Sequence, residues 1–300
     1  MTADMLIVGA GPAGCSAAVQ AAGLGMTSIV VDSADRPGGA LWRIGHLENL
    51  PGSWTDGPSY AEALGRDLDR LGDRCRYIQG EAVRVDAGPD HASVELADGR
   101  ILTSKHLVVA TGVRGARVSD IPWVTCAEDV PPLWNVTPGS LGQRTVVLGA
   151  DRPLGTWLRT HPEFDQNLTV LHPVGDDYKA DEVRSERRVQ LERIEQVSVL
   201  GTGPFEVEFT RVGGERETVT VEFVVINAGS VPASLPGLVT AIDGYCPPED
   251  QHPRIRTAGD LRSRRYQRVQ IAGGSGAEAA LAHYYGAQRS NGDAPTQTRL

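Results

Sequence analysis

The sequence predicts an α/β protein that is long enough for two domains, and three observations carry this prediction. Apolar runs of strand length, such as residues 5–8 and 145–148, lead into glycine-containing turns. Between such runs, residues 60–71 place apolar side chains at the spacing of an amphipathic helix. The 35 glycines and the 40% hydrophobic content suit a fold with many tight turns.

The first turn follows the pattern strand, G-x-G-x-x-G, helix, strand and acid. The glycine motif occupies residues 9–14, residues 29–32 form the second predicted strand, and Asp32 lies 18 residues beyond Gly14. The first glycine permits the tight turn, the second lets a pyrophosphate approach the backbone, and the third lets the helix pack closely. The N-terminus of the helix presents free N–H groups to phosphates, and Asp32 would accept hydrogen bonds from a ribose. We therefore predict a dinucleotide site.

Composition and charge argue against several partners. The net charge of −9 argues against nucleic acid, because binding to phosphates needs clustered Lys and Arg. No run of 18 apolar residues occurs, so we expect no membrane span. The chain begins directly with a predicted strand, so we expect no signal peptide and a cytoplasmic protein. No zinc spacing is present among the scattered cysteines, and no metal site is predicted at Cys15, Cys75, Cys126 and Cys246.

The remaining elements are predicted from apolar periodicity and turn residues. In chain order they are the helix at 60–71, one or two strands in 77–85, a hairpin at 92–101, a buried strand at 107–112, strands at 145–148 and 168–171, and alternating segments in 189–209 and 217–225. The buried strand ends in the sequence Ala-Thr-Gly at residues 110–112.

These motifs together resemble those of the low-molecular-weight thioredoxin reductase family of flavoproteins. The resemblance is carried by the motifs at residues 9–14, Gly38-Gly39, residues 48–52 (Glu-Asn-Leu-Pro-Gly), residues 110–112, residues 257–260 (Thr-Ala-Gly-Asp) and the closing helix at 274–280. It covers essentially the whole chain and implies FAD as the dinucleotide. It also implies two Rossmann-like domains of three ββα layers and a homodimer. Residues 1–112 and 232–300 would form a discontinuous FAD domain, and 113–231 an inserted, degenerate NADPH-type domain.

The resemblance also implies which residues hold FAD. Gly259 and Asp260 would hold the pyrophosphate–ribityl region, and the N-terminus of the helix that contains Gly276 would face the N1–O2 edge of the flavin. The family has an Arg-Gln pair before this helix, and this chain has Gln267-Arg268, which replaces a polar flavin contact by a cation. The FAD-binding residues expected from the resemblance are Gly9, Gly11, Pro12, Ala13, Gly14, Asp32, Gly38, Gly39, Ala40, Asn49, Val83, Ala110, Thr111, Gly112, Gly259, Asp260, Arg268 and Gly276.

The redox disulfide of the family is missing from this chain. Cys126 matches the first cysteine of the family's C-x-x-C, and Asp129 stands in the place of the second. Dithiol–disulfide exchange needs both sulfurs, so Cys126 alone cannot perform it within this loop. We predict instead that Asp129 is a general base in a dry pocket beside the flavin, where burial raises the pKa of a carboxylate. Cys126 is the candidate nucleophile. The alternative for Asp129 is a side chain that only faces solvent, and the alternative for Cys126 is a thiol that only packs in the core.

The nicotinamide nucleotide motifs of the family are also altered. The second glycine motif should begin at Gly149, but its middle glycine is Asp151 and its last small residue is Leu154. A carboxylate beside a pyrophosphate repels it by about 4 kcal/mol at 4 Å. The arginine pair that reads the 2′-phosphate in the family is replaced by Pro173-Val174 after His172. We therefore expect NADPH use to be lost.

The sequence leads to one functional prediction with open alternatives. We predict an FAD-dependent oxidoreductase that oxidises a small molecule without NADPH or a redox disulfide, with oxygen or a carrier protein as electron acceptor. One alternative is a flavoprotein reductase that exchanges electrons with a ferredoxin- or flavodoxin-type partner or still uses NAD(P)H. Another is a flavin-bound scaffold without catalytic activity.

Overall fold

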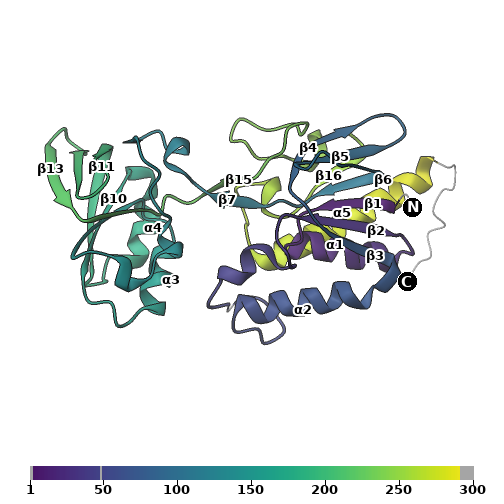
Figure 1. Cartoon of the computed structure of the whole chain (residues 1–300), viewed down its shortest axis with the longest axis horizontal. Helices are drawn as coiled ribbons and strands as arrows, with labels where there is room; N and C mark the ends of the chain where they lie inside the picture. The colour runs from purple at the N-terminus through teal and green to yellow at the C-terminus, as the bar shows by residue number, and fades with distance from the viewer. Residues whose placement is uncertain (1–2, 48, 291–300) are drawn as a thin grey trace. The chain divides into compact units, whose positions relative to one another are not determined.

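The computed structural model describes residues 3–47 and 49–290, and the chain divides into two compact units. The first unit combines the described residues up to Val113 with those from Pro232 onward, and the second is Arg114–Val231. The chain crosses between them in β7 (Val113–Gly115) and β15 (Ser230–Pro232), which pair as a two-stranded sheet (Figure 1). Glu48 of the predicted motif at 48–52 and residues 291–300 of the predicted FAD domain lie outside the described residues.

A seven-stranded sheet organises the first unit in the order β3-β2-β1-β6-β5-β4, with β16 beside β6. The strands β3, β2, β1, β6 and β16 run parallel, and β4 and β5 continue from β6 as an antiparallel meander. Its central strands are continuous apolar runs because both of their faces are buried. The strands are β1 (Ala3–Val8), β2 (Ser28–Asp32), β3 (Cys75–Gln79), β4 (Ala82–Ala87), β5 (Ala92–Leu96), β6 (Ile101–Val109) and β16 (Ile255–Thr257).

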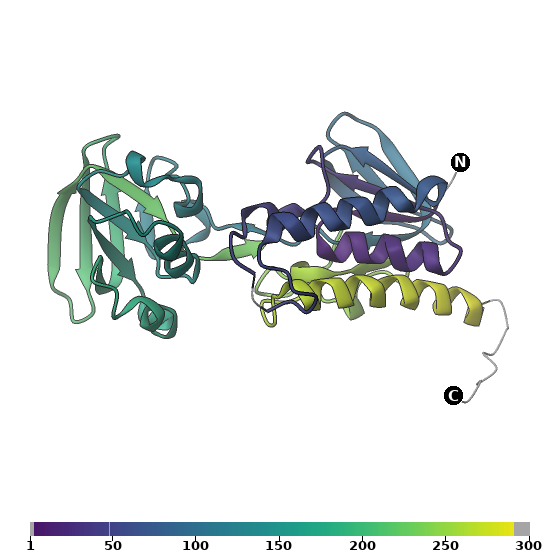
Figure 2. The same ribbon diagram turned by 90° about the horizontal axis from the view of Figure 1, so that it is seen from below.

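Three helices cover one face of this sheet (Figures 1 and 2): α1 (Pro12–Gly23), α2 (Gly57–Arg70) and α5 (Val269–Ser290). Alanines of α1 and α5 and leucines of α2 share one buried cluster with the sheet. Leucines and valines on the opposite face pack against β4 and β5. These layers confirm the predicted three-layer ββα arrangement.

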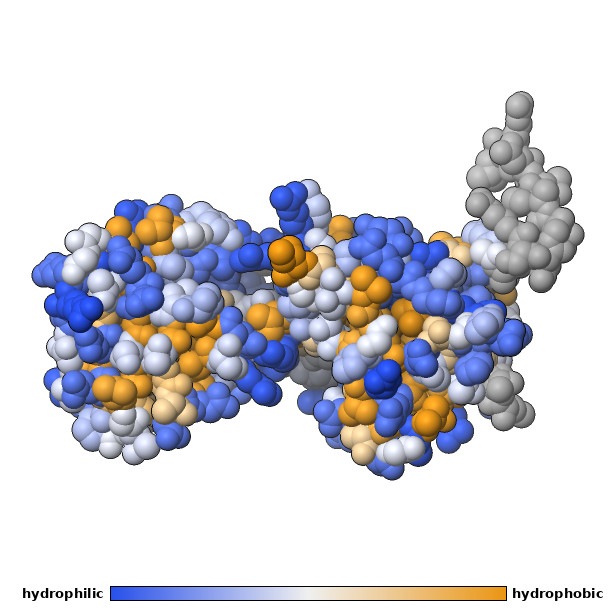
Figure 3. Space-filling view, turned by 90° about the horizontal axis from the view of Figure 1, so that it is seen from above, coloured by the Kyte–Doolittle hydropathy of each residue, from blue (hydrophilic) through white to orange (hydrophobic). Residues whose placement is uncertain are grey.

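The helices differ from their predicted bounds at the N-terminal ends. The helix predicted at 60–71 begins at Gly57, because the Asp56 side chain caps it by accepting the Ser59 N–H at 2.7 Å. The closing helix predicted at 274–280 begins earlier, at Val269. None of the described helices is long and apolar enough to cross a membrane, and apolar and polar side chains alternate in patches over the face drawn in Figure 3.

The second unit repeats the α/β plan around a sheet of order β13-β12-β11-β10-β9-β14, with β8 beside β11. The strands β9, β10 and β14 are parallel, and the long β11 joins them to the antiparallel pair β12 and β13. The strands are β8 (Val124–Cys126), β9 (Arg144–Leu148), β10 (Asn167–His172), β11 (Val189–Leu200), β12 (Phe205–Arg211), β13 (Arg216–Val221) and β14 (Phe223–Ile226). Two short helices, α3 (Pro153–Thr160) and α4 (Asp177–Ala180), complete it. The second Rossmann-like unit is thereby confirmed.

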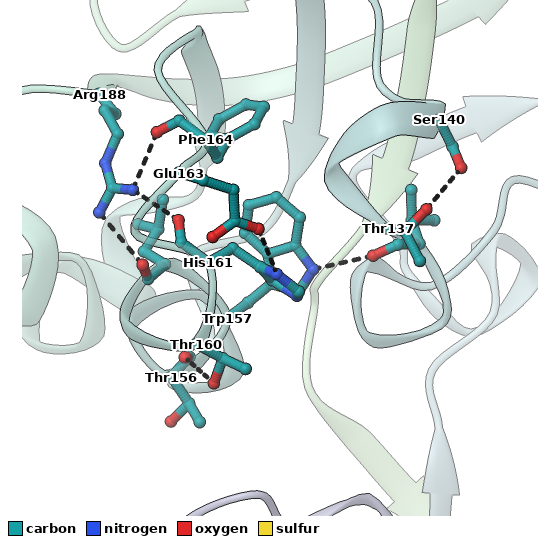
Figure 4. A network of polar contacts seen from close by, with 11 residues as sticks. Thr137, Ser140, Thr156, Trp157, Thr160, His161, Glu163, Phe164 and Arg188 are labelled. Atoms are coloured by element: carbon teal, nitrogen blue, oxygen red, sulfur yellow. Dashed lines mark hydrogen bonds and ion pairs between the residues drawn. The ribbon is translucent and has the colours of Figure 1, made fainter.

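The helix α3 is fastened to its surroundings by side-chain hydrogen bonds, which Figure 4 shows. The Arg188 guanidinium donates to the carbonyls of Leu158, His161 and Phe164, at and beyond the end of the helix. The Trp157 indole N–H donates to the Val136 carbonyl at 2.9 Å. The Arg188 bonds satisfy backbone acceptors at the C-terminus of α3, and the Trp157 bond ties the helix to the segment before β9.

Candidate functional site

The glycine turn between β1 and α1 is built by backbone hydrogen bonds. The Gly9 N–H donates to the Val31 carbonyl at 2.8 Å, which ties the turn to β2. The Asp32 carboxylate accepts the Ala10 N–H at 2.6 Å and the Ala34 N–H at 2.9 Å. The sequence predicted that Asp32 accepts hydrogen bonds from a ribose. In the structure its carboxylate also accepts two backbone N–H groups and thereby stabilises the turn.

The space around this turn fits a pyrophosphate. A Cβ at Gly9 would overlap the Ala110 carbonyl, and one at Gly14 would overlap the carbonyl of Gly9, so both positions exclude a side chain. Over Gly11, in contrast, no described atom outside its immediate chain neighbours lies within 4 Å of the Cβ position. No side chain caps the helix at Gly11 and no acid stands in its first turn, so its N–H groups and the helix dipole are available to an anion.

The Gly38-Gly39 pair lies against the same turn. The Gly38 N–H donates to the Ala10 carbonyl at 2.8 Å, and the Cβ position of Gly39 is 3.2 Å from the Gly11 Cα. Both glycines have positive φ angles, 121° and 55°, which other residues rarely adopt. The two glycine motifs of the sequence thus form one site.

The C-terminal segment brings Gly259 and Asp260 to α1. The Gly259 N–H donates to the Ser275 hydroxyl at 2.8 Å, and a Cβ there would lie 3.0 Å from the Ala13 Cβ. Among the described residues the Asp260 carboxylate has no hydrogen-bond partner. Burial raises the pKa of Asp260 to about 6, and the positive charge of Arg268 opposes this rise. A half-desolvated acceptor without a donor fits the hydroxyl groups of a ribityl chain.

The closing helix has a different relation to the site from the one predicted. Gly276 lies in the interior of α5, where a Cβ would overlap the carbonyl of Ala13, so this glycine serves the close contact with α1. The N-terminus of α5 is formed instead at Arg268, whose carbonyl accepts the Ala272 N–H at 2.8 Å. The predicted start of this helix at residue 274 is wrong, because α5 starts at Val269, and the approach of its N-terminus to the flavin stays a prediction.

Other predicted FAD-binding residues have fewer contacts with the glycine turn between β1 and α1. The Ala110 N–H donates to the Val8 carbonyl at 2.7 Å, and the Thr111 hydroxyl donates to the Ala233 carbonyl, which joins the two segments of the unit. Gly112 has open space at its Cβ position. The side chains of three others are exposed, and their cofactor contacts stay predictions: Ala40, Asn49 and Val83.

The loop after β8 carries the predicted catalytic residues on the surface of the second unit. The Cys126 thiol donates a hydrogen bond to the Glu128 carbonyl at 3.2 Å. The side chains of Glu128 and Asp129 are exposed, because the loop leaves the sheet after its last pairing with β11. Within its own unit Asp129 is therefore open to solvent, and its predicted place in a dry pocket beside the flavin stays a prediction.

Charged and amide side chains from several segments meet beside the second glycine turn, after β9. The Asp151 carboxylate lies 3.1 Å from the Lys179 ammonium, which lies 3.1 Å from Asp176 as well. Although burial lowers the pKa of Lys179, the two carboxylates raise it above its ordinary value. The Asn227 side chain donates to the Asp151 carbonyl at 2.8 Å. A carboxylate, a lysine and an amide thus hold the position where a Rossmann turn receives a pyrophosphate.

The residues around this turn have structural contacts within the second unit. Leu154 is fully buried among the side chains of β9, β10 and α3. Arg152 pairs with Glu182 at 2.9 Å, and the His172 ring is buried at the end of β10. The sequence indicated the unfavourable charge of Asp151 but missed Lys179, because no local pattern brings α4 to this turn.

A cavity of about 420 Å³ lies at the end of β10 in the second unit. Its lining includes Arg184, Arg193 and Arg211, whose side chains already pair with carboxylates within 3.0 Å. Each of these guanidinium groups therefore already has an acidic partner, although the pairs of Arg184 and Arg193 are exposed and weak.

Comparisons with known proteins agree with this architecture. A family model described as pyridine nucleotide-disulphide oxidoreductase matches residues 3–151. The NADH dehydrogenase of Bacillus subtilis is 28% identical over 93% of this chain, which spans only a little over half (57%) of that relative's length. The thioredoxin reductase of Listeria innocua is 23% identical, and the match covers 91% of this chain and 90% of the relative.

Solved structures show the same fold. The crystal structure of Lactococcus lactis thioredoxin reductase matches over 95% of this chain and 98% of that chain, with a TM-score of 0.78 at 21% identity. The predicted fold is thereby confirmed. The family model over residues 3–151 and the similar relatives support the predicted family, a thioredoxin reductase-like member of the pyridine nucleotide-disulphide oxidoreductases.

Proposed function

We propose that the protein is an FAD-dependent oxidoreductase that works without NADPH and without a redox disulfide. It oxidises a small molecule, and its electrons pass to oxygen or to a carrier protein. The observation that carries the proposal is the contrast between the two glycine turns. The turn at Gly11 is open to a pyrophosphate, whereas the turn at Asp151 is closed by the ion pairs of Lys179.

The first unit supports FAD as the bound group. The open space over Gly11, the uncapped N-terminus of α1 and the partnerless carboxylate of Asp260 match a pyrophosphate and a polyhydroxyl chain. Bound FAD would supply hydride acceptance, which lies beyond the capacity of side chains alone. The protein binds and orients it, with Asp260 and Gly259 from one end of the chain and the β1–α1 turn from the other.

The second unit argues against NADPH as the electron source. An incoming pyrophosphate would meet the Asp151 carboxylate and would have to break its pairing with the partly buried Lys179. Removing one partner from a fully buried pair costs about 3–5 kcal/mol, which sets an upper limit for this pair. The names of the relatives include thioredoxin reductase and NADH dehydrogenase; we propose that this chain keeps their scaffold and not those electron routes.

Catalytic roles for the loop after β8 remain part of the proposal. Asp129 accepts the substrate proton, provided that bound substrate removes water from its exposed carboxylate. Cys126 is a positioning residue instead of a nucleophile, because its thiol is already engaged as a donor to the Glu128 carbonyl. The homodimer and the cytoplasmic location stay predictions from the sequence.

An anaerobic titration tests the proposal. NADPH, NADH, dithionite and candidate substrates are each added to the purified yellow protein, and the flavin band at about 450 nm is followed. We expect bleaching by dithionite and by a substrate but not by NADPH or NADH. Fast bleaching by NADPH would refute the proposal, and bleaching by dithionite alone would support the scaffold alternative. If Asp129 is the base, Asp129→Asn slows reduction by substrate about 100-fold, and an unchanged rate removes it from the mechanism.

A further inference from the structure

A short segment between the Thr-Ala-Gly-Asp motif at residues 257–260 and α5 carries several positive charges. Residues 263–268, which we name the arginine loop, join η9 (Gly259–Arg262) to α5. Its three arginines, Arg264, Arg265 and Arg268, are exposed and take part in no ion pair with any described residue. Tyr266 between them is 77% exposed. This display is unusual in a chain with a net charge of −9.

The arginine loop is held in one conformation by its inward-facing residues. The Gln267 side chain donates to the Tyr245 hydroxyl at 3.1 Å and to the Ser263 carbonyl at 3.2 Å. The Ser263 hydroxyl accepts the Arg265 N–H at 3.0 Å. Tyr266 has a φ of 63°, a left-handed conformation that costs a non-glycine residue about 1 kcal/mol or more. The hydrogen bonds therefore maintain a strained backbone that directs the arginines and the tyrosine into solvent.

The arginine loop adjoins the proposed FAD site. Asp260 and Ser263 are separated by only two residues, Leu261 and Arg262. The charge of Arg268 acts on the Asp260 carboxylate, and its carbonyl begins the hydrogen-bond ladder of α5. The N-terminus of α5 adds about half a positive charge at the same place. The positive field is therefore centred next to the residues that would hold the ribityl chain.

The exposure of the arginine loop points to a large partner. Sites for small molecules bury about 70–90% of the ligand in a concave lining. Side chains as exposed as Tyr266 cannot provide such an enclosure. Arginine and tyrosine are, however, the residues enriched at protein interfaces and in their energetic centres. A positive patch on an acidic protein also steers an acidic partner toward one orientation.

We propose that the arginine loop is the docking surface for an acidic one-electron carrier protein, which removes electrons from the enzyme. The inference rests on the proposed function, which requires an acceptor. Each oxidation of substrate yields two electrons and two protons. Each carrier accepts one electron, so two oxidised carriers dock in turn and leave reduced, while the two protons are released to solvent.

Two probe proteins of opposite charge test this surface. Plastocyanin, an acidic copper protein, and cytochrome c, a basic haem protein, both accept one electron. The holoprotein is reduced photochemically under argon, so no substrate or NADPH is needed. The rate of reduction of each probe is measured between about 20 and 300 mM ionic strength. Binding of oxidised plastocyanin to the oxidised holoprotein is measured by calorimetry as a readout independent of turnover.

We compare Arg264→Glu/Arg265→Glu with the control Arg76→Glu/Arg187→Glu, which changes the net charge equally at exposed arginines elsewhere. We expect faster reduction of plastocyanin than of cytochrome c at low salt. We also expect a loss of about tenfold or more in rate and affinity in the first variant only. Equal effects in both variants, or no preference between the probes, would overturn the inference. Neither outcome touches the proposed function, which the NADPH titration decides separately.

Discussion

Replacing Asp260 by asparagine should raise the stability of the FAD-free protein and weaken its hold on FAD. Burial raises the pKa of Asp260 from 3.8 to about 6 in the folded state. A raised carboxyl pKa means that the folded protein retains a proton that the unfolded chain has released. Stability therefore falls as the pH rises from about 4 to about 6, and remains reduced above that range.

The size of the effect follows from the two pKa values. The difference between 3.8 and about 6 corresponds to about 3 kcal/mol at pH 8. The asparagine side chain carries no charge at any pH, so Asp260→Asn should stabilise the FAD-free protein by up to that amount at pH 8. At pH 4, where the wild-type carboxyl is largely protonated, we expect the gain to be small. In the presence of FAD we expect this gain to be largely offset, because a charged acceptor contributes about 1.5–3 kcal/mol to a hydrogen bond.

Urea unfolding of the FAD-free protein at pH 4 and pH 8 measures the first effect, and titration with FAD measures the second. Asp35→Asn removes a carboxylate of the same size from an exposed position and serves as the matched control. Lower stability of Asp260→Asn at pH 8, or an equal change at both pH values, would show that the carboxylate is not held in a desolvated site.

Three further changes test the packing that surrounds the two glycine turns. Gly276→Ala should destabilise the first unit by about 2–3 kcal/mol and release FAD, because the new methyl group overlaps an α1 carbonyl. The control Gly274→Ala lies on the same helix with open space at its Cβ position, so it should stabilise the protein by up to about 1 kcal/mol in thermal unfolding. Asp151→Ala should destabilise the second unit by about 2 kcal/mol in urea, because a partly buried lysine loses a partner, whereas Asp181→Ala at an exposed ion pair should change stability by less than about 0.5 kcal/mol. Burial lowers the pKa of His283 to about 3, so below about pH 6.5 the unfolded chain binds a proton that the folded state excludes. His283→Phe should therefore reduce the loss of stability between pH 6 and pH 4 by about 1.4 kcal/mol per pH unit. An unchanged slope would contradict a buried neutral imidazole.

The first site could be predicted from the sequence because its geometry depends on glycines at fixed spacing. Gly14 excludes a side chain through overlap with the Gly9 carbonyl of the same β–α turn, so this requirement is visible in the local sequence, whereas the overlap at Gly9 is with the distant Ala110 carbonyl. The meeting of Gly259 with α1 could be predicted only by family resemblance, since nothing local in the sequence connects residues so far apart.

The sequence missed features that depend on contacts between distant elements. Lys179 reaches the turn at Asp151 only because α4 packs beside it, so the sequence indicated a repulsive carboxylate and not a satisfied ion pair. The exposure of Asp129 depends on where the β8 loop leaves its sheet. The start of α5 was placed too late because the family resemblance was carried only by residues 274–280, whereas the helix begins at Val269.

Both units keep the backbone of a Rossmann-like turn. Gly149 retains a positive φ of 101°, as Gly9 does at 97°, because both turns bring a helix back over the end of a strand. The two turns differ in the residue two positions after this glycine, which is Gly11 in the first turn and Asp151 in the second. At Gly11 the space over the backbone is open, whereas at Asp151 a carboxylate stands paired with Lys179, and the Asn227 side chain donates to the Asp151 carbonyl. The carboxylate at the second turn is already paired with Lys179 and repels an anion, which is why we propose that only the first turn gains binding energy from a nucleotide.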